Sequence, residues 1–483
     1  MSLIIPANSA SAAGGYAVDN SCRFNGTAAY LNRTQGTSTN LTKFAWSGWI
    51  KRSKLAADQV VTMNYASASN YGYFYFRGTD DLRIFDRGAG GDTVAISDML
   101  FRDISAWYHI ALIIDTTQAT NTNRLKLYVN GILQGLNGVT YPAENASLGW
   151  KVANTSNTFL MRANSADSYV GGYLAEVAYV DGTANAITDF GEFDEDSGIW
   201  KPIDVSGLTF GNEGYYLDFQ DSANLGNDVT GGTDFTENSL AAIDQTTDTP
   251  TNNFITLNPL ITLTSRTDNQ VYSEGNTIVI PNSTDNYGTA FGTFGATRGK
   301  WYWEAQIIWN GTSNNANFPK QIGFMREDYA FNKSYLGQND DQTWGVAFHD
   351  LGTDGWGLDH NGSFSAISGA TTLADDKMVM FALDLDNGKF YMGYDGSWFT
   401  SGDPTSGATG TGAIATLDAT DLSFTIIPAL TNATNTTYYK MNFGNPAYAI
   451  ASSNTDGDGF GNFEFAVPSG YFSWCTKNLA EYG

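Results

Sequence analysis

Residues 107–131, WYHIALIIDTTQATNTNRLKLYVNG, decide the fold of this chain. Two runs within this stretch, 109–115 and 125–129, alternate apolar and polar side chains, as strands with one buried face do. A polar loop without a helical period separates the two runs. Asn130-Gly131 follows the second run and supplies the positive φ angles of a tight hairpin turn. The stretch therefore predicts two antiparallel strands and a third that begins directly after the turn.

The composition extends this prediction to the whole chain. A chain of 483 residues is long enough for two or more domains. Its 12 Trp, 26 Tyr and 29 Phe can fill large cores, and its 52 Gly are typical of short strands joined by many turns. No long segment shows helical periodicity, so the sequence predicts an all-β fold class with two β-sandwich domains. The expected parts are an N-terminal arm at 1–20, a first sandwich at 21–235, a polar, Asp- and Thr-rich linker at 236–259, a second sandwich at 260–475 and a C-terminal tail at 476–483.

Charge and cysteine content exclude several classes of function. The chain has 25 Lys and Arg against 50 Asp and Glu, which gives a net charge of −25. An acidic surface repels nucleic acid and anionic membranes, so we expect no nucleic-acid partner and no membrane insertion. Cys22 and Cys475 stand far apart in the sequence and match neither a disulfide framework nor a metal site. No signal peptide or transmembrane run is visible, so we expect a chain that is made without secretion.

Four segments of the first half follow one another in an order that identifies a fold family. They are C-R-F-N-G at 22–26, F-A-W-S-G-W-I-K at 44–51, W-Y-H-I-A-L with L-K-L-Y-V-N-G within 107–131, and G-Y-L-A-E-V-A-Y-V-D-G at 172–182. In this order the segments resemble the strands of a laminin-G-like, concanavalin-type jelly roll. The resemblance covers about residues 20–235 and implies a sandwich of two antiparallel sheets.

The second half carries a different series of motifs. They are G-K-W-Y-W-E at 299–304, I-G-F at 322–324, G-V-A-F at 345–348, L-D-L-D-N-G at 383–388, I-I-P-A-L at 426–430 and N-F-G at 442–444. This series resembles the SPRY (B30.2) domain and implies a second β-sandwich. Asn387-Gly388 predicts a hairpin turn between strands at 378–386 and 389–393. Asp376-Lys377 stands where the family usually has Gly-Asp, so the start of the first of these strands stays open.

One acidic segment has the residue types of a glycosidase site. On a strand, Glu192, Asp194 and Asp196 would face one way, as a retaining glycosidase requires of a nucleophile and an acid about 5 Å apart. Glu195 interrupts this pattern, and Gly198 favours a bend, so we interpret the segment as a solvated acidic loop. The chain has no nucleophile elbow, P-loop, dinucleotide fingerprint or zinc spacing. The sequence therefore predicts a protein that is not an enzyme and has no catalytic residues.

A second candidate is a metal site near the end of the chain. Asn454, Asp456 and Asp458 place oxygen ligands at alternate positions, followed by Gly459, as at the front of a calcium loop. The twelfth position holds Phe465 instead of the bidentate Glu of such a loop. A simple Gly/Asp turn and a Ca²⁺ site therefore both stay open, and Ca²⁺ is the one candidate cofactor.

Candidate ligand-binding residues follow from the laminin-G-like resemblance, since such domains bind calcium or sugar through loop Asp and Asn residues. Asp80, Asp81 and Asp181 lie at the ends of expected strands. Trp356 and Trp398 are candidates for stacking on a sugar face, although most aromatic side chains are expected to fill the two cores.

A wider resemblance covers the full length. The segments that carry it are L-I-I-P-A-N-S at 3–9, F-G-E-F-D-E-D-S-G-I-W-K-P at 190–202, D-Q-T-T-D-T-P-T-N-N-F at 244–254 and F-E-F-A-V-P-S-G-Y-F-S-W-C-T-K-N-L-A-E at 463–481. They resemble structural proteins of marine bacteriophages. The resemblance implies a non-enzymatic virion protein, a tail fibre or surface appendage assembled in the host cytoplasm, that binds a host-surface glycan or protein.

Two alternatives to adhesion stay open. The first is a decoration or connector protein that contacts only other virion proteins, with residues 1–20 as its docking element. The second is a glycan depolymerase that acts through Glu192 and Asp194. Appendages of this kind are commonly homo-oligomers, often trimers, but the sequence contains no visible trimerisation segment.

Overall fold

The computed structural model of the chain describes residues 15–150, 156–261, 270–281, 288–309, 321–349, 355–368, 375–432 and 437–483. These residues divide between Asn253 and Phe254 into two compact units. We call residues 15–253 the first unit and residues 254–483 the second unit. Strands account for 44% of the described residues and helices for 7%, which confirms the all-β fold class.

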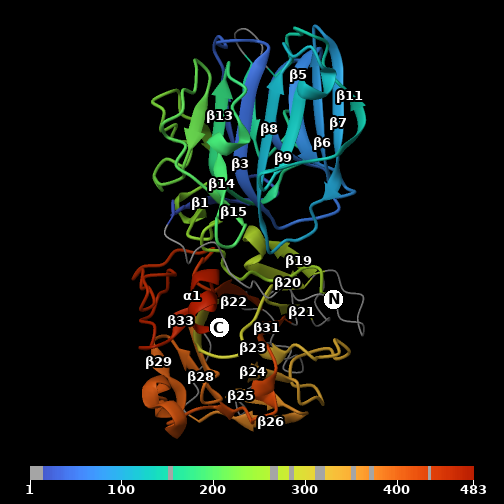
Figure 1. Cartoon of the computed structure of the whole chain (residues 1–483). Coiled ribbons are helices and arrows are strands. Elements are labelled where there is room, and N and C mark those ends of the chain that lie inside the picture. The colour runs from blue at the N-terminus through green and yellow to red at the C-terminus, as the bar shows by residue number, and fades with distance from the viewer. Residues whose placement is uncertain are drawn as a thin grey trace. The chain divides into compact units, whose positions relative to one another are not determined.

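The first unit is a sandwich of two antiparallel sheets (Figure 1). Sheet A has the order β10-β9-β8-β3-β13-β1-β18, with β16 paired to β13, and sheet B has the order β11-β7-β6-β5-β4-β12-β2-β17. The strands of sheet A are β1 (Ser21–Asn25), β3 (Lys43–Arg52), β8 (Trp107–Asp115), β9 (Leu125–Val129), β10 (Ile132–Leu133), β13 (Gly171–Asp181), β16 (Tyr215–Leu217) and β18 (Gln245–Thr246). Those of sheet B are β2 (Tyr30–Thr34), β4 (Gln59–Ser67), β5 (Asn70–Phe76), β6 (Asp81–Gly88), β7 (Gly91–Leu100), β11 (Leu136–Thr140), β12 (Asn157–Leu160) and β17 (Thr236–Asn238). A separate hairpin consists of β14 (Gly191–Phe193) and β15 (Trp200–Pro202).

The decisive stretch folds as predicted, because β8 and β9 pair antiparallel in sheet A. Asn130 and Gly131 have φ angles of 48° and 76°, as both central residues of a type I′ turn require. Directly after this turn, β10 pairs Ile132 with Val129. The inner faces of both sheets bury aromatic side chains between them. Within this core the Trp46 ring lies 4.7 Å from that of Phe74.

The predicted linker at 236–259 is wrong for most of its length. β17 pairs with β2 in sheet B, and β18 pairs with β1 in sheet A. After β18, the buried Asp248 accepts hydrogen bonds from the side chains of Lys51 and Trp107 on sheet A. These pairings could not be predicted from the polar composition of the segment. Backbone hydrogen bonds and one buried ion pair hold these edge strands in place, so the strands need few apolar residues.

The described part of the predicted N-terminal arm belongs to the first unit. Tyr16 and Val18 pack on the outer face of sheet A, in a cluster with Trp49, Trp107 and Tyr173. Residues 1–14 of the arm lie outside the described residues.

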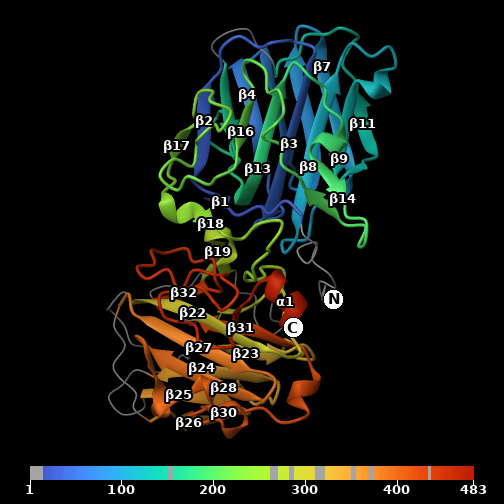
Figure 2. The ribbon, with the colours of Figure 1, turned by 60° about the vertical axis from the view of Figure 1, so that its left-hand side comes forward.

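The second unit is also a sandwich (Figure 2). Its larger sheet has the order β19-β20-β32-β22-β27-β28-β29, with β30 paired to β28 and β33 parallel to β22, and its smaller sheet has the order β21-β31-β23-β24-β25-β26. The larger sheet contains β19 (Gln270–Ser273), β20 (Ile278–Pro281), β22 (Lys300–Trp309), β27 (Met378–Asp384), β28 (Lys389–Tyr394), β29 (Ser397–Trp398), β30 (Ala415–Thr416), β32 (Thr437–Asn442) and β33 (Phe472–Ser473). The smaller sheet contains β21 (Gly288–Phe291), β23 (Gln321–Arg326), β24 (Thr343–His349), β25 (Gly355–His360), β26 (Ser363–Ala366) and β31 (Ile426–Asn432).

The predicted hairpin at 378–393 forms, with a longer loop than expected. Asp384 pairs with Lys389, so four residues connect β27 and β28, and Gly388 has a φ of 63°. Asp384 also accepts hydrogen bonds from the backbone and side chain of Asn387, which holds the loop closed.

The predicted tail at 476–483 is instead a packed helix, α1 (Thr476–Tyr482). Leu479 packs against the core of the second unit, and Asn478 is 1% exposed. Among the described helices, none combines the length and apolar character needed to cross a membrane. The remaining described helices are short 3₁₀ turns at Asn121–Asn123, Ile187–Asp189, Ala242–Asp244, Glu274–Asn276, Phe399–Ser401, Pro404–Thr409 and Asp421–Ser423.

Candidate ligand groove in the first unit

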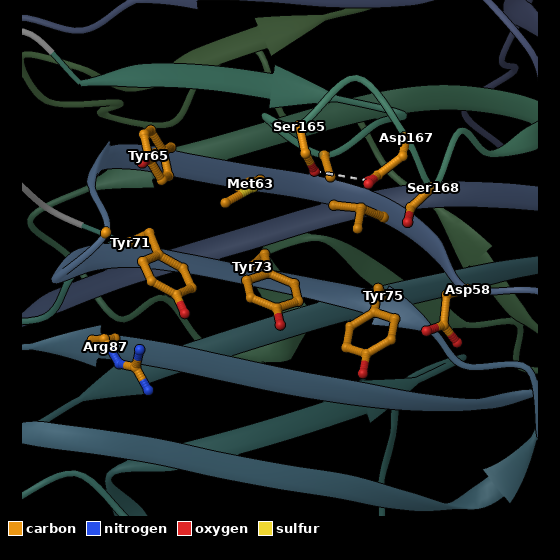
Figure 3. A pocket seen from close by; sticks show the side chains of 13 residues that line it. Asp58, Met63, Tyr65, Tyr71, Tyr73, Tyr75, Arg87, Ser165, Asp167 and Ser168 are labelled. Atoms are coloured by element: carbon orange, nitrogen blue, oxygen red, sulfur yellow. Dashed lines mark hydrogen bonds between the residues drawn. The ribbon is translucent and has the colours of Figure 1, made fainter.

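The outer face of sheet B carries a row of tyrosines along β5. Successive side chains of a strand point to opposite faces, so Tyr71, Tyr73 and Tyr75 face outward while Phe74 and Phe76 enter the core. Along the row, ring centroids are 5.9 Å apart between Tyr71 and Tyr73 and 5.3 Å apart between Tyr73 and Tyr75. Figure 3 shows the three rings side by side along one strand.

The neighbouring strand β4 widens this aromatic surface. Tyr65 pairs across the ladder with Tyr71, and Met63 pairs with Tyr73. Cross-strand partners on one face of a sheet lie in direct side-chain contact. The Tyr65 and Tyr71 rings are accordingly 6.1 Å apart. Two strands therefore form the floor of a groove.

The loop after β12, residues 161–170, forms one wall of the groove. Val60 donates a backbone hydrogen bond of 2.8 Å to the Ser168 carbonyl, which joins this loop to the start of β4. Met161, Ala166 and Ser168 all have positive φ angles, between 54° and 69°. Each such conformation costs an L-residue about 1–2 kcal/mol. The wall is thus a constrained loop, of the kind that recurs at ligand clamps.

The groove encloses about 510 Å³. This volume falls within the range of about 300–1,000 Å³ that is typical of small-molecule sites. Thirteen residues line it: Asp58, Val60, Met63, Tyr65, Ala68, Tyr71, Tyr73, Tyr75, Arg87, Ala163, Ser165, Asp167 and Ser168.

The two ends of the groove differ in charge. Arg87 lies beside Tyr71 at one end, with its guanidinium 5.6 Å from the ring centroid. Asp58 and Asp167 lie toward the Tyr75 end (Figure 3). Burial, and then the neighbouring tyrosines and Asp58, raise the pKa of Tyr73 above its ordinary value of 10.0, although Arg83 opposes this rise. The Tyr73 hydroxyl therefore stays protonated at neutral pH and can donate a hydrogen bond.

The sequence-predicted ligand residues of the first unit lie elsewhere, in structural interactions. The buried Asp80 carboxylate is 3.3 Å from a guanidinium nitrogen of Arg52. Asp81 accepts two hydrogen bonds from Arg77, at 2.5 and 2.6 Å. Asp181 is 2% exposed and accepts a backbone hydrogen bond from Thr39. Carboxylates that are buried and bonded in this way hold strand ends together and offer no open ligand site.

The two predicted tryptophans of the second unit do not form a sugar platform together. Trp356 is 1% exposed and belongs to the core, which removes it from contact with any ligand. Trp398 is half-buried and packs beside Tyr302, with ring centroids 6.5 Å apart. The prediction for Trp356 is therefore wrong for a physical reason, namely complete burial.

One of the three candidate calcium residues, Asp456, bonds to the C-terminal helix, and we call its contacts with Ser473 and Asn478 the latch. Asp456 Oδ2 accepts hydrogen bonds from Ser473 and, at 2.8 Å, from Asn478 of α1. Its Oδ1 accepts the backbone N–H groups of Asp458 and Phe460. The side chain of Asn454 instead donates to backbone carbonyls nearby. Across the part of the chain that the structure describes, no group of three or more His, Cys, Asp or Glu side chains could hold a metal ion.

The acidic segment folds as the tip of the β14–β15 hairpin. Lys201 lies 3.3 Å from carboxylate oxygens of both Glu192 and Asp194. Hydrogen bonds from Ser197 lower the pKa of Asp194 to about 2, and Lys201 contributes to this shift. Both acids thus share one lysine as their ionic partner, and the lowered pKa of Asp194 is the opposite of what a glycosidase acid needs.

Sequence reasoning identified the β5 strand but missed the groove. The available signal was the series Tyr71, Tyr73 and Tyr75, which alternates with Gly72, Phe74 and Phe76. A sandwich strand buries only one face, so an aromatic strand of this kind must expose half of its rings.

The comparisons with known proteins concern fold. Residues 25–186, about a third of the chain, match the family model Laminin_G_3, described as the concanavalin A-like lectin/glucanases superfamily. No curated protein matches the chain.

Solved structures match parts of the chain at low identity. Stonustoxin is 13% identical with a TM-score of 0.27, and the match covers 39% of this chain and 28% of the toxin chain. The SPRY domain of human HERC1 is 15% identical with a TM-score of 0.24, over 34% of this chain and 86% of that one. The native heptameric SAP-like pentraxin from Limulus polyphemus is 14% identical with a TM-score of 0.29, and the match covers 42% of this chain and 93% of the pentraxin chain. By the Laminin_G_3 family model, the first unit contains a region similar to concanavalin A-like lectin and glucanase domains.

Proposed function

We propose that this chain is a non-enzymatic bacteriophage virion protein that binds a host-surface glycan through the tyrosine groove of its first unit. The observation that carries this proposal is the groove itself, in which half-buried rings lie beside hydroxyl and carboxylate groups. Aromatic faces with a few placed polar groups are the usual lining of a small-molecule site. The virion assignment is supported by the resemblance of segments across the chain to structural proteins of marine bacteriophages.

A glycan array with the full chain tests the binding. We expect Tyr71→Ala combined with Tyr73→Ala to weaken binding of the best glycan about thirtyfold, as the loss of about 2 kcal/mol at a binding hot spot would. Tyr73→Phe should keep most of the affinity if stacking dominates over the hydroxyl. Tyr128→Ala is the matched control, because Tyr128 is a half-buried tyrosine of sheet A. Binding that survives the double substitution would place the site elsewhere.

An exposed apolar edge supports a second candidate, a structural role through contact with other virion proteins. Ile132 and Leu133 on the edge strand β10 are 59% and 55% exposed. Phe193 on the β14–β15 hairpin is 48% exposed. Exposed apolar side chains of this kind mark protein contacts. A chain that binds no glycan, but loses incorporation into virions after Ile132→Ser with Leu133→Ser, would favour this role.

The proposal excludes a depolymerase acting through the acidic hairpin. Glu192 and Asp194 share Lys201 as their ionic partner, and hydrogen bonds from Ser197 lower the pKa of Asp194, which disfavours this carboxyl as a proton donor. If the chain cleaved a glycan and Glu192→Gln abolished the cleavage, this part of the proposal would be overturned.

A further inference from the structure

We infer that the groove selects its glycan by charge and prefers an amine-bearing sugar, whose ammonium group is held at the end formed by Asp58 and Asp167. This inference rests on the proposed glycan binding and names the chemical class of the glycan. It concerns the Tyr75 end of the groove, where Asp58 lies beyond the last ring and Asp167 lies on the facing loop (Figure 3).

Asp58 is placed by the strand that follows it. β4 begins at Gln59, and Val60 pairs with Tyr75, so Asp58 lies at the end of the tyrosine row. The side chain is exposed, and its Oδ1 accepts a hydrogen bond of 2.8 Å from the Gly78 backbone. That bond orients the carboxylate and leaves its second oxygen for a ligand.

Asp167 reaches the same end from the opposite wall. The bond between Val60 and the Ser168 carbonyl holds its loop against the start of β4. Asp167 Oδ1 accepts a hydrogen bond of 2.9 Å from the Ser165 hydroxyl, and the Asp167 side chain is exposed. Within the described part of the chain, neither Asp58 nor Asp167 forms an ion pair with a lysine or arginine. Two carboxylates thus face one end of the groove without a cation.

The arginine at the other end is already neutralised. Arg87 donates two hydrogen bonds to Asp92, at 2.8 and 2.7 Å, in a bidentate pair. Its guanidinium also lies over the rings of Tyr71 and Phe85. An anionic sugar would have to displace Asp92 from this pair, on a chain whose net charge is −25. The groove therefore offers an anion little attraction.

An ammonium group satisfies the chemistry of the Tyr75 end. It carries three donors and can bind either carboxylate, and its charge is attracted by tyrosine faces. A neutral sugar would use only the stacking surface and the hydroxyls. A uronic acid or sulfated sugar would meet like charge at the carboxylates. The expected order of affinity is amine-bearing, then neutral, then anionic.

The test compares three probes on the full chain: a glucosamine oligomer, its N-acetylated counterpart and a uronic-acid oligomer. At about pH 5.5, the sugar amine of the glucosamine oligomer, with a pKa of about 7.7, is protonated and Asp carboxylates are ionised. We expect the glucosamine oligomer to bind about fivefold more tightly than the N-acetylated oligomer, as a partly exposed ion pair allows. At about 1 M salt, where the Debye length falls to about 3 Å, the preference should disappear.

Asp58→Asn with Asp167→Asn should remove the preference, so that the variant binds the glucosamine oligomer and the N-acetylated oligomer with equal affinity. Asparagine keeps the acceptor oxygen for Gly78 and for Ser165, so both walls stay in place. The matched control is Asp98→Asn with Asp221→Asn, which removes the same charge from exposed positions outside the groove.

The outcomes distinguish a failure of the charge preference from a failure of glycan binding itself. Binding of none of the three probes would count against glycan binding itself and would overturn both. Equal binding of the glucosamine and N-acetylated oligomers, or a preference that survives the double Asp substitution, would overturn the charge inference alone. An oligolysine peptide that binds as tightly as the glucosamine oligomer would show a general cation site and would also overturn it.

Discussion

Lys51 Nζ lies 2.7 Å from Asp248 Oδ2, and the two side chains are 1% and 0% exposed. The pair joins β3 to a segment almost two hundred residues later, which sequence composition placed in a linker. Trp107 Nε1 donates a hydrogen bond of 3.0 Å to the other carboxylate oxygen of Asp248. The side-chain oxygen of Asn253 accepts a hydrogen bond of 2.7 Å from Lys51. Burial lowers the pKa of Lys51, and Asp248 opposes this shift. The first unit therefore extends to Asn253 through a buried ionic contact.

Asp248→Ala is expected to destabilise the first unit by about 3 kcal/mol, because it leaves the Lys51 charge buried without its partner. Urea unfolding of the full chain, followed by tryptophan fluorescence, measures this change. Glu144→Ala is the control, since Glu144 is 52% exposed in its pair with Arg124 and should contribute less than about 1 kcal/mol. Equal effects of the two substitutions would show that the buried pair adds nothing.

Glu176 makes the stability of the first unit depend on pH. Burial raises the pKa of Glu176 to about 7 from 4.5, although hydroxyls of Tyr216 and Tyr16 donate to its carboxylate. The folded chain therefore binds this proton more tightly than the unfolded chain. The stability that it contributes is complete below about pH 4.5 and is lost as the pH rises to about 7.

Glu176→Gln should remove this part of the pH dependence, which is at most about 3 kcal/mol. The measurement is the urea midpoint of wild type and variant at several values from about pH 5 to about pH 8. Other buried acids affect both chains equally, so the difference between them isolates Glu176. A difference that stays constant over this range would contradict the assignment.

The latch on the C-terminal helix predicts a local effect of Asp456→Ala. Its loss leaves the buried Ser473 N–H without an acceptor, at about 1–3 kcal/mol, and removes the bond from Asn478, which keeps only its bonds to Ser473. Hydrogen exchange should therefore become faster throughout α1. Asp341→Ala is the control, because Asp341 is an exposed acid of the second unit outside this latch. Unchanged exchange in α1 after Asp456→Ala would refute the latch.

The same contacts predict that Ca²⁺ does not stabilise this loop. A cation at Asp456 would displace backbone and side-chain donors from both carboxylate oxygens. We expect the thermal midpoint of the full chain to be the same in excess Ca²⁺ and in a chelator. A rise with Ca²⁺ that Asp458→Ala abolishes would restore the calcium interpretation.

Much of the fold could be predicted, because the strands around β8 and β9 alternate clearly and Asn130-Gly131 defines their turn. The extent of the first unit could not be predicted from the sequence, since β17 and β18 are polar edge strands that become evident only through their pairing with β2 and β1. A buried carboxylate such as Asp248 has no sequence signature that separates it from an exposed one.

The groove illustrates a different limit. The alternation of Tyr71, Tyr73 and Tyr75 with core residues was visible, but both faces of β5 are aromatic, so hydrophobicity alone does not tell which face is outside. Asp58 and Asp167 come from segments about a hundred residues apart and are brought to one groove by the pairing of β12 with β4 and by the bond from Val60 to Ser168. The predicted Asp80, Asp81 and Asp181 lie at strand ends as expected, yet their partners are structural.

The most direct test of glycan binding is a crystal structure of the full chain with the glycan that ranks first on the array. We expect a sugar ring against Tyr71 and Tyr73, with polar contacts to the 161–170 loop. A sugar bound at any other surface, with the groove filled only by solvent, would contradict it.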